Sequence, residues 1–266
     1  MSEAVVEVGR KGAVATVTLN RPAALNALDD AMMAAMEEAF TTLEADTSVR
    51  AVVVRGAGEH FMAGGDVKLF HRGLDLPPAE RRRRLELFVH KVHPTVTAIR
   101  RMPMPVIASV RGAAAGFGLS LVMACDLALA ADSAYFTLAY SLIGTSPDGS
   151  GTYHLPRIVG MKKAMEIALL AERFDAATAL ALGLVNRVVP AAELESATTA
   201  LAERLAAGPS HAYGNTKRLL GQSLANSLAE QLQAEAESFA DCAASEDFAE
   251  GVRAFVEKRK PRFTGR

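Results

Sequence analysis

The sequence predicts an α/β fold over residues 1–190 and a helical section over residues 191–266. Short runs rich in branched apolar residues alternate with segments whose apolar residues recur at helical spacing. Glycine-rich loops separate several of these segments, and no strand-like run follows Val189-Pro190. A chain of 266 residues, 50% of them hydrophobic, can bury a sizeable core.

The first elements are two strands and a helix. Residues 4–8 and 14–19 are too short for helices and rich in branched side chains, so they are expected to be strands. Asn20-Arg21-Pro22 ends the second of them. Apolar residues at helical spacing then predict a helix from Asp29 to about Asp46.

The middle of the chain continues the alternation. Residues 52–54 form a buried strand, a loop rich in glycine covers 56–66, and a long helix is expected from Pro77-Pro78 to about Met102. A strand over 105–110, a helix of small residues over 116–124 and a strand over 127–130 follow. We therefore expect strands that are connected by crossover helices.

The last part predicts helices over 191–207, 215–243 and 245–260. They carry an apolar stripe, formed by Leu219, Leu220, Leu224, Leu228 and Leu232. Such a stripe fits a face packed on the chain's own core, and it fits an interface between subunits equally well.

Charge and composition exclude several classes of function. The chain has 29 Lys and Arg against 30 Asp and Glu, so it offers no basic surface for nucleic acid, and any anion must be recognised locally. Its apolar runs are far shorter than the ~20 residues that span a bilayer, and its first residues lack the features of a signal peptide. We expect a soluble, cytoplasmic protein without a membrane partner. Two cysteines are too few for a disulfide framework.

Common catalytic motifs are absent, but three junctions contain glycine. The sequence has no phosphate-binding Walker loop, no His-Glu-x-x-His, no Cys-x-x-Cys and no Gly-x-Ser-x-Gly. Residues 61–68 contain Gly64-Gly65-Asp66, where Asp66 suits a helix N-cap. Residues 111–120 run through small side chains into a helix. The small side chains allow close packing of the helix on a strand, and the unpaired N–H groups of its first turn suit an oxyanion hole. Asp148, within residues 144–152, fits a turn or an N-cap.

The ordered set of segments resembles the crotonase (enoyl-CoA hydratase/isomerase) superfamily. The resemblance covers nearly the whole chain and is carried by six segments: Leu19-Asn20-Arg21-Pro22, Asn26-Ala27-Leu28, Ala63-Gly64-Gly65-Asp66, residues 112–126, Leu155-Pro156-Arg157-Ile158-Val159-Gly160 and residues 250–260. It implies a spiral of β-β-α units that binds an acyl-CoA substrate, followed by a helical trimerisation region. The expected assembly is a homotrimer or a dimer of trimers, with no cofactor, since coenzyme A is part of the substrate.

The resemblance also implies roles for individual residues. The amides that polarise the thioester carbonyl fall on Gly65 and Phe117. Phe255 and Lys258 are expected to reach the CoA of a neighbouring subunit. The remaining expected CoA contacts are Arg21, Ala24, Ala63, Asp66, Val67 and Lys68.

The departure from the family pattern carries the functional expectation. Hydratases of the family use two glutamates, and the matching positions here are Ser120 and Tyr140, which do not replace carboxylates at ordinary pKa values. Asp148 falls where isomerase members carry their catalytic carboxylate. The resemblance thus implies a shift of an enoyl double bond with Asp148 as the base. That role requires apolar neighbours that raise its pKa, for which we expect Phe136, Leu138, Tyr140 and Leu142.

Other readings stay open. A hydratase would need another group that activates water. A haloaryl-CoA dehalogenase would use Asp148 with His93, although Tyr140 stands where those dehalogenases carry Trp, and a thioester hydrolase would use Asp148 as nucleophile or base. A non-catalytic acyl-CoA binding protein would keep Gly65, Phe117 and the CoA contacts but leave Asp148 solvated and far from the acyl chain. His90 and His93 lack a third metal ligand, so no metal site is expected, and residues 81–84, all arginine, suit a solvated helix face or CoA phosphates.

Overall fold

The structure, a computed structural model, describes residues 4–266, so the first three residues of the predicted core segment lie outside it. A six-stranded sheet has the order β1-β2-β3-β4-β6-β9, and a three-stranded sheet has the order β5-β7-β8. β1 pairs antiparallel with β2, and all other neighbours in the larger sheet are parallel. The strands are β1 (Val6–Lys11), β2 (Val14–Leu19), β3 (Ala51–Gly56), β4 (Val106–Val110), β5 (Ala113–Ala115), β6 (Leu127–Ala131), β7 (Tyr135–Thr137), β8 (Phe174–Asp175) and β9 (Arg187–Val189).

A β-β-α order recurs along the chain. β4 and β5 precede α5, and β6 and β7 precede α6, with the first strand of each pair in the large sheet and the second in the small one. This alternation between two sheets confirms the expected spiral. The helices are α1 (Asp30–Ala45), α2 (Val67–His71), α3 (Pro78–His90), α4 (His93–Arg101), α5 (Phe117–Ala124), α6 (Gly151–Val159), α7 (Met161–Leu170), α8 (Ala176–Ala181), α9 (Leu194–Ala206), α10 (Ser210–Gln222), α11 (Leu228–Ala243) and α12 (Glu246–Val256).

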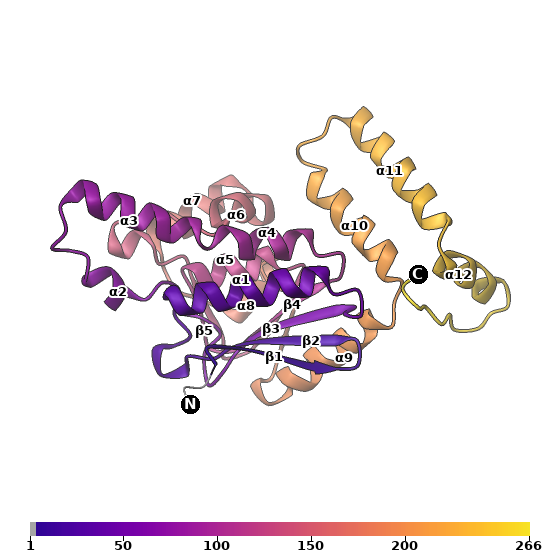
Figure 1. Ribbon diagram of the computed structural model, residues 1–266, viewed down its shortest axis with the longest axis horizontal. Helices are drawn as coiled ribbons and strands as arrows, with labels where there is room; N and C mark the ends of the chain where they lie inside the picture. Colours follow the sequence, from indigo (N-terminus) through magenta and orange to yellow (C-terminus); the bar gives the residue numbers. More distant parts are fainter. Residues whose placement is uncertain (1–3) are drawn as a thin grey trace.

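The two faces of the large sheet are covered by different helices, as Figure 1 shows for α1 and α9. Val52 and Val54 of β3 face the main core, where α1 contributes Met36. Val53 between them points to the other face and packs in a second cluster with Leu194 of α9. Side chains alternate across a strand, so residues 51–54 of β3 are all apolar because both faces are buried there, whereas Arg55 is exposed. α9 therefore packs on the sheet although it follows Pro190.

The long helix expected from Pro77-Pro78 to Met102 is wrong, because the structure has two helices there. α3 ends at His90 and α4 begins at His93, with Pro94 in its first turn. In one continuous helix the Pro94 ring would clash with the carbonyl of His90, four residues earlier. β1 also begins two residues and ends three residues later than expected, whereas β2 matches its predicted bounds.

The C-terminal helices differ from the expectation in a similar way. The predicted helix over 215–243 is wrong as a single element, because α10 ends at Gln222 and α11 begins at Leu228. Ser227 and Glu230 cap each other's backbone N–H in a capping box, which fixes the new start. α12 ends at Val256, before the expected end at Lys260.

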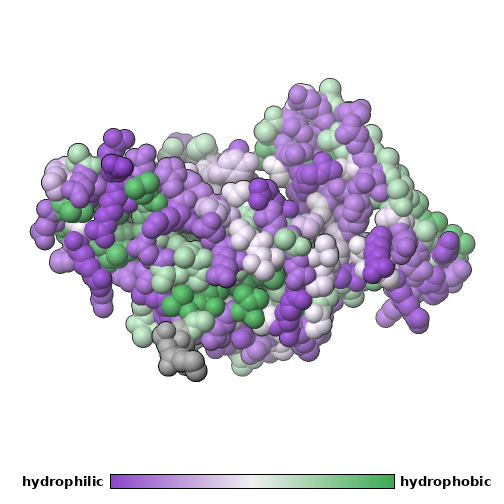
Figure 2. Space-filling view, viewed as in Figure 1, coloured by the Kyte–Doolittle hydropathy of each residue, from purple (hydrophilic) through white to green (hydrophobic). Residues whose placement is uncertain are grey.

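Helices α10 to α12 project from the rest of the chain (Figure 1), and the predicted apolar stripe lies on α10, on α11 and between them. Leu220, Leu224, Leu228 and Leu232 are between 55% and 76% exposed, so they are not part of this chain's own core. Figure 2 shows apolar side chains along the outer edge of α11 and α12. Of the two readings of the stripe, the structure favours an interface. None of the helices within residues 4–266 has the length and apolar character needed to cross a membrane.

Candidate active site

The loop around Gly64-Gly65 is fastened to the loop that precedes α1. Ala63 N–H donates to the Leu25 carbonyl at 3.0 Å, and Leu28 N–H donates to the Gly64 carbonyl at 2.7 Å. Gly64 has φ +89°, and a Cβ on it would lie 3.0 Å from the Ala115 carbonyl, so only glycine suits this position. The Asp66 side chain accepts from Lys68 N–H and caps α2, as the sequence predicts.

A second loop meets the first at the start of α5. Gly116 has φ +53° and donates to the Thr137 carbonyl at 3.0 Å, which places Phe117 as the first residue of the helix. A Cβ built on Gly64 would lie 3.5 Å from the Phe117 nitrogen, so the two loops are in contact. Neither the Gly65 N–H nor the Phe117 N–H donates to any described residue. Two free donors on adjoining loops are the arrangement that an oxyanion requires.

The third junction is a turn that rests against the second loop. Gly151 N–H donates to the Asp148 carbonyl at 3.0 Å, and Gly149 between them has φ +56°. A side chain on Gly149 would overlap the Phe117 ring. Ser150 occupies the N-cap position of α6 without a side-chain capping hydrogen bond, so of the two readings of Asp148 the turn is correct. The carboxylate is therefore free for other contacts.

Two side chains that the sequence singled out contact Asp148. Tyr140 Oη donates to Asp148 Oδ1 at 2.6 Å, and Ser120 Oγ donates to the Asp148 backbone carbonyl at 3.0 Å. His93 is exposed at the start of α4, and its charge lowers the pKa of Asp148. The positions that match the hydratase glutamates thus hold hydroxyl groups that orient Asp148 and its turn.

Burial raises the pKa of Asp148 above its ordinary value, while the Tyr140 hydrogen bond and the charge of His93 oppose that rise. Burial first, and then the neighbouring Asp148, raise the pKa of Tyr140, so its hydroxyl stays protonated and donates. Phe136 and Leu138, two of the apolar residues expected near Asp148, are fully buried. The expectation for Leu142 is wrong: it is 69% exposed, because the turn at Ser141–Ile143 directs it outward.

The expected CoA contacts fall into two groups. Arg21 forms ion pairs with Asp29 at 3.0 Å and Asp66 at 3.3 Å, which holds it against the first loop. The other members of this group, Ala24, Ala63, Val67 and Lys68, lie on the same two loops or at the start of α2.

Phe255 and Lys258 form the second group. They lie at or just beyond the end of α12, which Figure 1 places at the opposite end of the molecule from α2, and Phe255 is 86% exposed. Phe255 and Lys258 therefore lie far from the Gly65 loop of their own chain. This position is compatible with the expectation that they contact the CoA of a neighbouring subunit.

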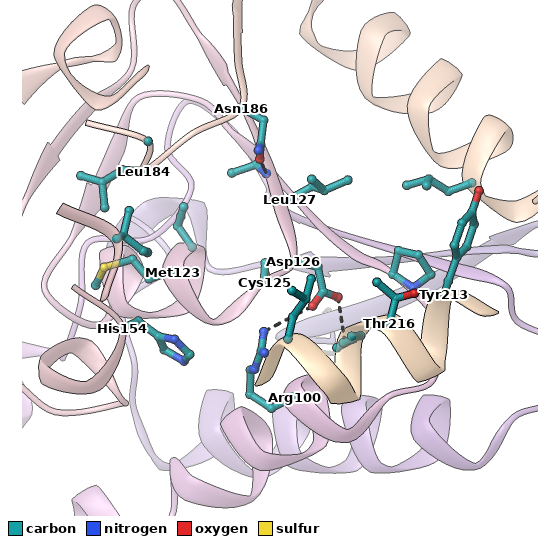
Figure 3. A pocket seen from close by; sticks show the side chains of 18 residues that line it. Arg100, Met123, Cys125, Asp126, Leu127, His154, Leu184, Asn186, Tyr213 and Thr216 are labelled. Carbon is teal, nitrogen blue, oxygen red and sulfur yellow. Dashed lines mark hydrogen bonds and ion pairs between the residues drawn. The ribbon is translucent and has the colours of Figure 1, made fainter. Parts of the chain in front are cut away.

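An ion-pair cluster that the sequence analysis missed lies at a cavity of about 430 Å³ between β6, α6 and α10. Figure 3 shows Asp126 directed toward Arg100. Asp126 pairs with Lys217 at 2.7 Å and with Arg100 at 3.3 Å. Burial, followed by the charges of Arg100 and Arg157, lowers the pKa of His154 beside it to about 4. The cavity lining includes neither Gly65 nor Asp148, so the cavity is separate from the loops described above. The ion pairs of Asp126 with Lys217 of α10 and Arg100 of α4 attach α10 to the core.

In the described part of the chain, no group of three or more His, Cys, Asp or Glu side chains could hold a metal ion. The His90 and His93 rings lie edge to face with their centroids 5.2 Å apart.

Comparison with known proteins gives concordant results. The family model described as Enoyl-CoA hydratase/isomerase matches residues 9–266. The chain is 41% identical to a probable enoyl-CoA hydratase of Rhodobacter capsulatus over 95% of each chain. It is 37% identical to the 1,2-epoxyphenylacetyl-CoA isomerase of Escherichia coli over 100% of each. The crystal structure of an enoyl-CoA hydratase from Polaromonas sp. JS666 superimposes with a TM-score of 0.90 at 34% identity, covering 97% of this chain and 99% of that one.

Proposed function

The chain belongs to the enoyl-CoA hydratase/isomerase family, and on that premise we propose that it moves the double bond of a 3-enoyl-CoA to the 2-position. The observation that carries this proposal is the single carboxylate of Asp148, oriented by Tyr140, beside two loops with free amides. A 1,3-proton shift needs one base and a place for negative charge on the thioester oxygen. These residues offer both.

Asp148 removes a proton from C2 of the substrate, and the electron pair of that C–H bond delocalises toward the thioester oxygen. The Gly65 and Phe117 N–H groups donate to this oxygen, and each such donor contributes about 2.7–4 kcal/mol to catalysis. Protonated Asp148 then returns the proton to C4, so the double bond lies between C2 and C3. The raised pKa of Asp148 brings its basicity closer to that required at neutral pH.

Hydration is less well supported by the side chains present. It requires a group that activates water and another that protonates the α-carbon. Ser120 and Tyr140 occupy the positions of the hydratase glutamates, and the Tyr140 hydroxyl already donates to Asp148. The Escherichia coli relative named as an isomerase supports a second chemistry within this family, although hydratase names are more frequent among the relatives.

Three substrates offered in parallel test the proposal. Purified protein is incubated with a 3-enoyl-CoA, a 2-enoyl-CoA and a 4-halobenzoyl-CoA, and the products are followed as double-bond position, 3-hydroxyacyl-CoA and free halide. We expect 2-enoyl-CoA to form from the 3-enoyl substrate. If 3-enoyl-CoA is untouched while 2-enoyl-CoA is hydrated, the isomerase assignment is wrong.

The charge of His93, which acts on the pKa of Asp148, favours one second candidate. In a dehalogenase Asp148 would attack carbon and His93 would activate the water that releases the product, and a thioester hydrolase would use Asp148 as nucleophile or base. The same experiment detects this function, since halide or free acid would appear. A protein that binds all three thioesters without turnover would be a non-catalytic acyl-CoA binder.

Replacing Tyr140 by Phe is expected to shift the pH dependence of isomerisation. The Tyr140 hydrogen bond lowers the pKa of Asp148, so its loss raises that pKa further. Because the base must be ionised, the acid limb of the kcat/KM profile moves to higher pH in Tyr140→Phe. Initial rates between pH 5 and 9 measure this shift. A limb at unchanged pH would mean that Tyr140 does not act on the catalytic carboxylate.

We also propose that the exposed stripe along α10, α11 and the segment between them joins subunits into a trimer or a dimer of trimers. Light scattering is expected to give three or six times the 28.1 kDa chain mass. The double variant Leu224→Glu/Leu228→Glu places charges on side chains that are 71% and 76% exposed, and we expect it to lower that mass. Val8→Glu, which lies on the edge strand β1, is the matched control. A double variant with the parent's mass contradicts the interface.

A further inference from the structure

A hollow of about 500 Å³ lies between α2 and α3, next to the candidate active site. Part of its lining is apolar, with Leu69, Phe70 and Phe88 among the lining residues. The rest of the lining includes four cationic side chains and the carboxylates of Asp30 and Glu80. Figure 2 shows apolar side chains among hydrophilic ones over these two helices.

The lining has four cations against two carboxylates, so it carries excess positive charge. Lys91 pairs with Asp30 at 2.6 Å, and Arg81 is held by the Leu74 carbonyl at 3.0 Å while keeping its charge. Arg83 and Arg84 form no ion pair with any residue in the described range 4–266. A solvated helix face explains exposed arginines, but it does not explain why these two border a hollow that also has an apolar side.

Phe70 connects the hollow to the oxyanion loop. A Cβ on Gly65 would lie 2.7 Å from Phe70 Cζ, so the ring packs directly on Gly65, and the same ring lines the hollow. Phe70 meets Phe88 of α3 edge to face, with ring centroids 5.4 Å apart. These two rings form the apolar boundary between the oxyanion loop and the arginines.

Phe70 is the link between the hollow and the candidate active site, because its ring contacts Gly65 and also lines the hollow. An acyl chain that starts at the Gly65 and Phe117 amides therefore has this hollow nearby as a place for its distal atoms. Its methylenes would contact the phenylalanines before its end meets the guanidinium groups.

We propose that this hollow receives the distal end of the acyl group and selects an acyl group that ends in a carboxylate, so that the preferred substrate is the monothioester of an unsaturated dicarboxylic acid. The proposal rests on the proposed function of the same site. Arg83 and Arg84 supply planar donors that match a carboxylate, and charge-assisted hydrogen bonds of this kind are stronger than neutral ones. The phosphates of CoA share this chemistry, so the test separates the two anions.

The test compares 3-hexenoyl-CoA with 3-hexenedioyl-CoA, which differ in the terminal carboxylate. We expect the parent to prefer the dicarboxylic substrate in kcat/KM by about tenfold, the order expected for one or two partly exposed ion pairs. Arg83→Ala/Arg84→Ala is expected to lose this preference and to keep its rate on 3-hexenoyl-CoA. Arg82→Ala is the matched control, because Arg82 lies in the same arginine run but does not line the hollow.

Two results overturn the proposal. If the double variant loses the same factor on both substrates, the arginines bind CoA phosphates. If the parent prefers 3-hexenoyl-CoA, the hollow does not select a carboxylate. Calorimetric titration with saturated hexanedioyl-CoA and hexanoyl-CoA tests the hollow without turnover. A binding preference for hexanedioyl-CoA that the double variant loses therefore supports the hollow even if neither enoyl substrate is isomerised and the proposed function fails.

Discussion

Asp148→Asn is expected to reduce kcat for the double-bond shift by about 10³-fold with little change in KM, because general acid–base catalysis by one group contributes roughly 10²–10⁴. Asn keeps the shape of the side chain and can still accept the hydrogen bond that Tyr140 donates at 2.6 Å. It cannot take a proton from C2. The loss therefore falls on the chemical step and leaves the amides of Gly65 and Phe117 to bind the thioester.

Proton NMR in D₂O measures the step itself. The parent is expected to exchange the C2 protons of the substrate or product for deuterium, since Asp148 takes up a proton there, and Asp148→Asn is not. An Asp148→Asn variant that retains parental isomerisation would remove Asp148 from the mechanism. Loss of thioester binding together with activity would show that Asp148 acts on binding and not on the proton.

The same substitution is expected to stabilise the fold at neutral pH. Burial raises the pKa of Asp148 in the folded state above its ordinary value of 3.8, so the folded chain holds this proton more tightly than the unfolded chain. Its contribution to stability is present below pH 3.8 and is lost as the pH rises through the raised folded pKa. Asn has no such loss. We expect Asp148→Asn to raise Tm by about 2–4 °C at pH 7 and to leave it unchanged near pH 3, as measured by calorimetry.

Elements that depend on local pattern were predictable from the sequence. β2 alternates branched residues between two clear breaks, and the Asp29 side chain caps α1 by accepting from Met32 N–H at 2.8 Å. The roles of Gly64 and Gly116 as turn residues also follow from their type, since both have positive φ. Each of these features is decided within about one turn of chain.

Features that depend on distant contacts were not predictable. The break after His90 depends on Pro94 but also on Val92, which turns into the core and is 2% exposed. Phe70 has no signal in the sequence that pairs it with Gly65, because only tertiary packing brings α2 back over the loop. The outward direction of Leu142 depends likewise on a short 3-10 turn. Periodicity does not register such contacts.

The cluster at Asp126 shows the same limit and leads to a stability prediction with a large effect. Asp126, Arg100 and Lys217 come from three distant segments, and nothing local marks them as partners. Lys217 Nζ also donates to the Ile99 carbonyl at 2.7 Å, and its side chain is only 9% exposed. Asp126 is thus the anion for a buried ammonium on α10 and for a partly buried guanidinium on α4, while its Oδ2 accepts from Val106 N–H at 2.8 Å.

Asp126→Ala is expected to lower the free energy of unfolding by about 3 kcal/mol, since it leaves two cations without their carboxylate. Lys217→Met is expected to cost much less, because Asp126 keeps Arg100 and the Val106 amide. Burial already lowers the pKa of Lys217 despite the opposing attraction of Asp126, so removing that charge also removes a desolvation penalty. Urea denaturation of both variants at one protein concentration measures the difference. Equal losses, or a larger loss for Lys217→Met, would mean that packing of the lysine stem, and not the shared carboxylate, attaches α10 to the core.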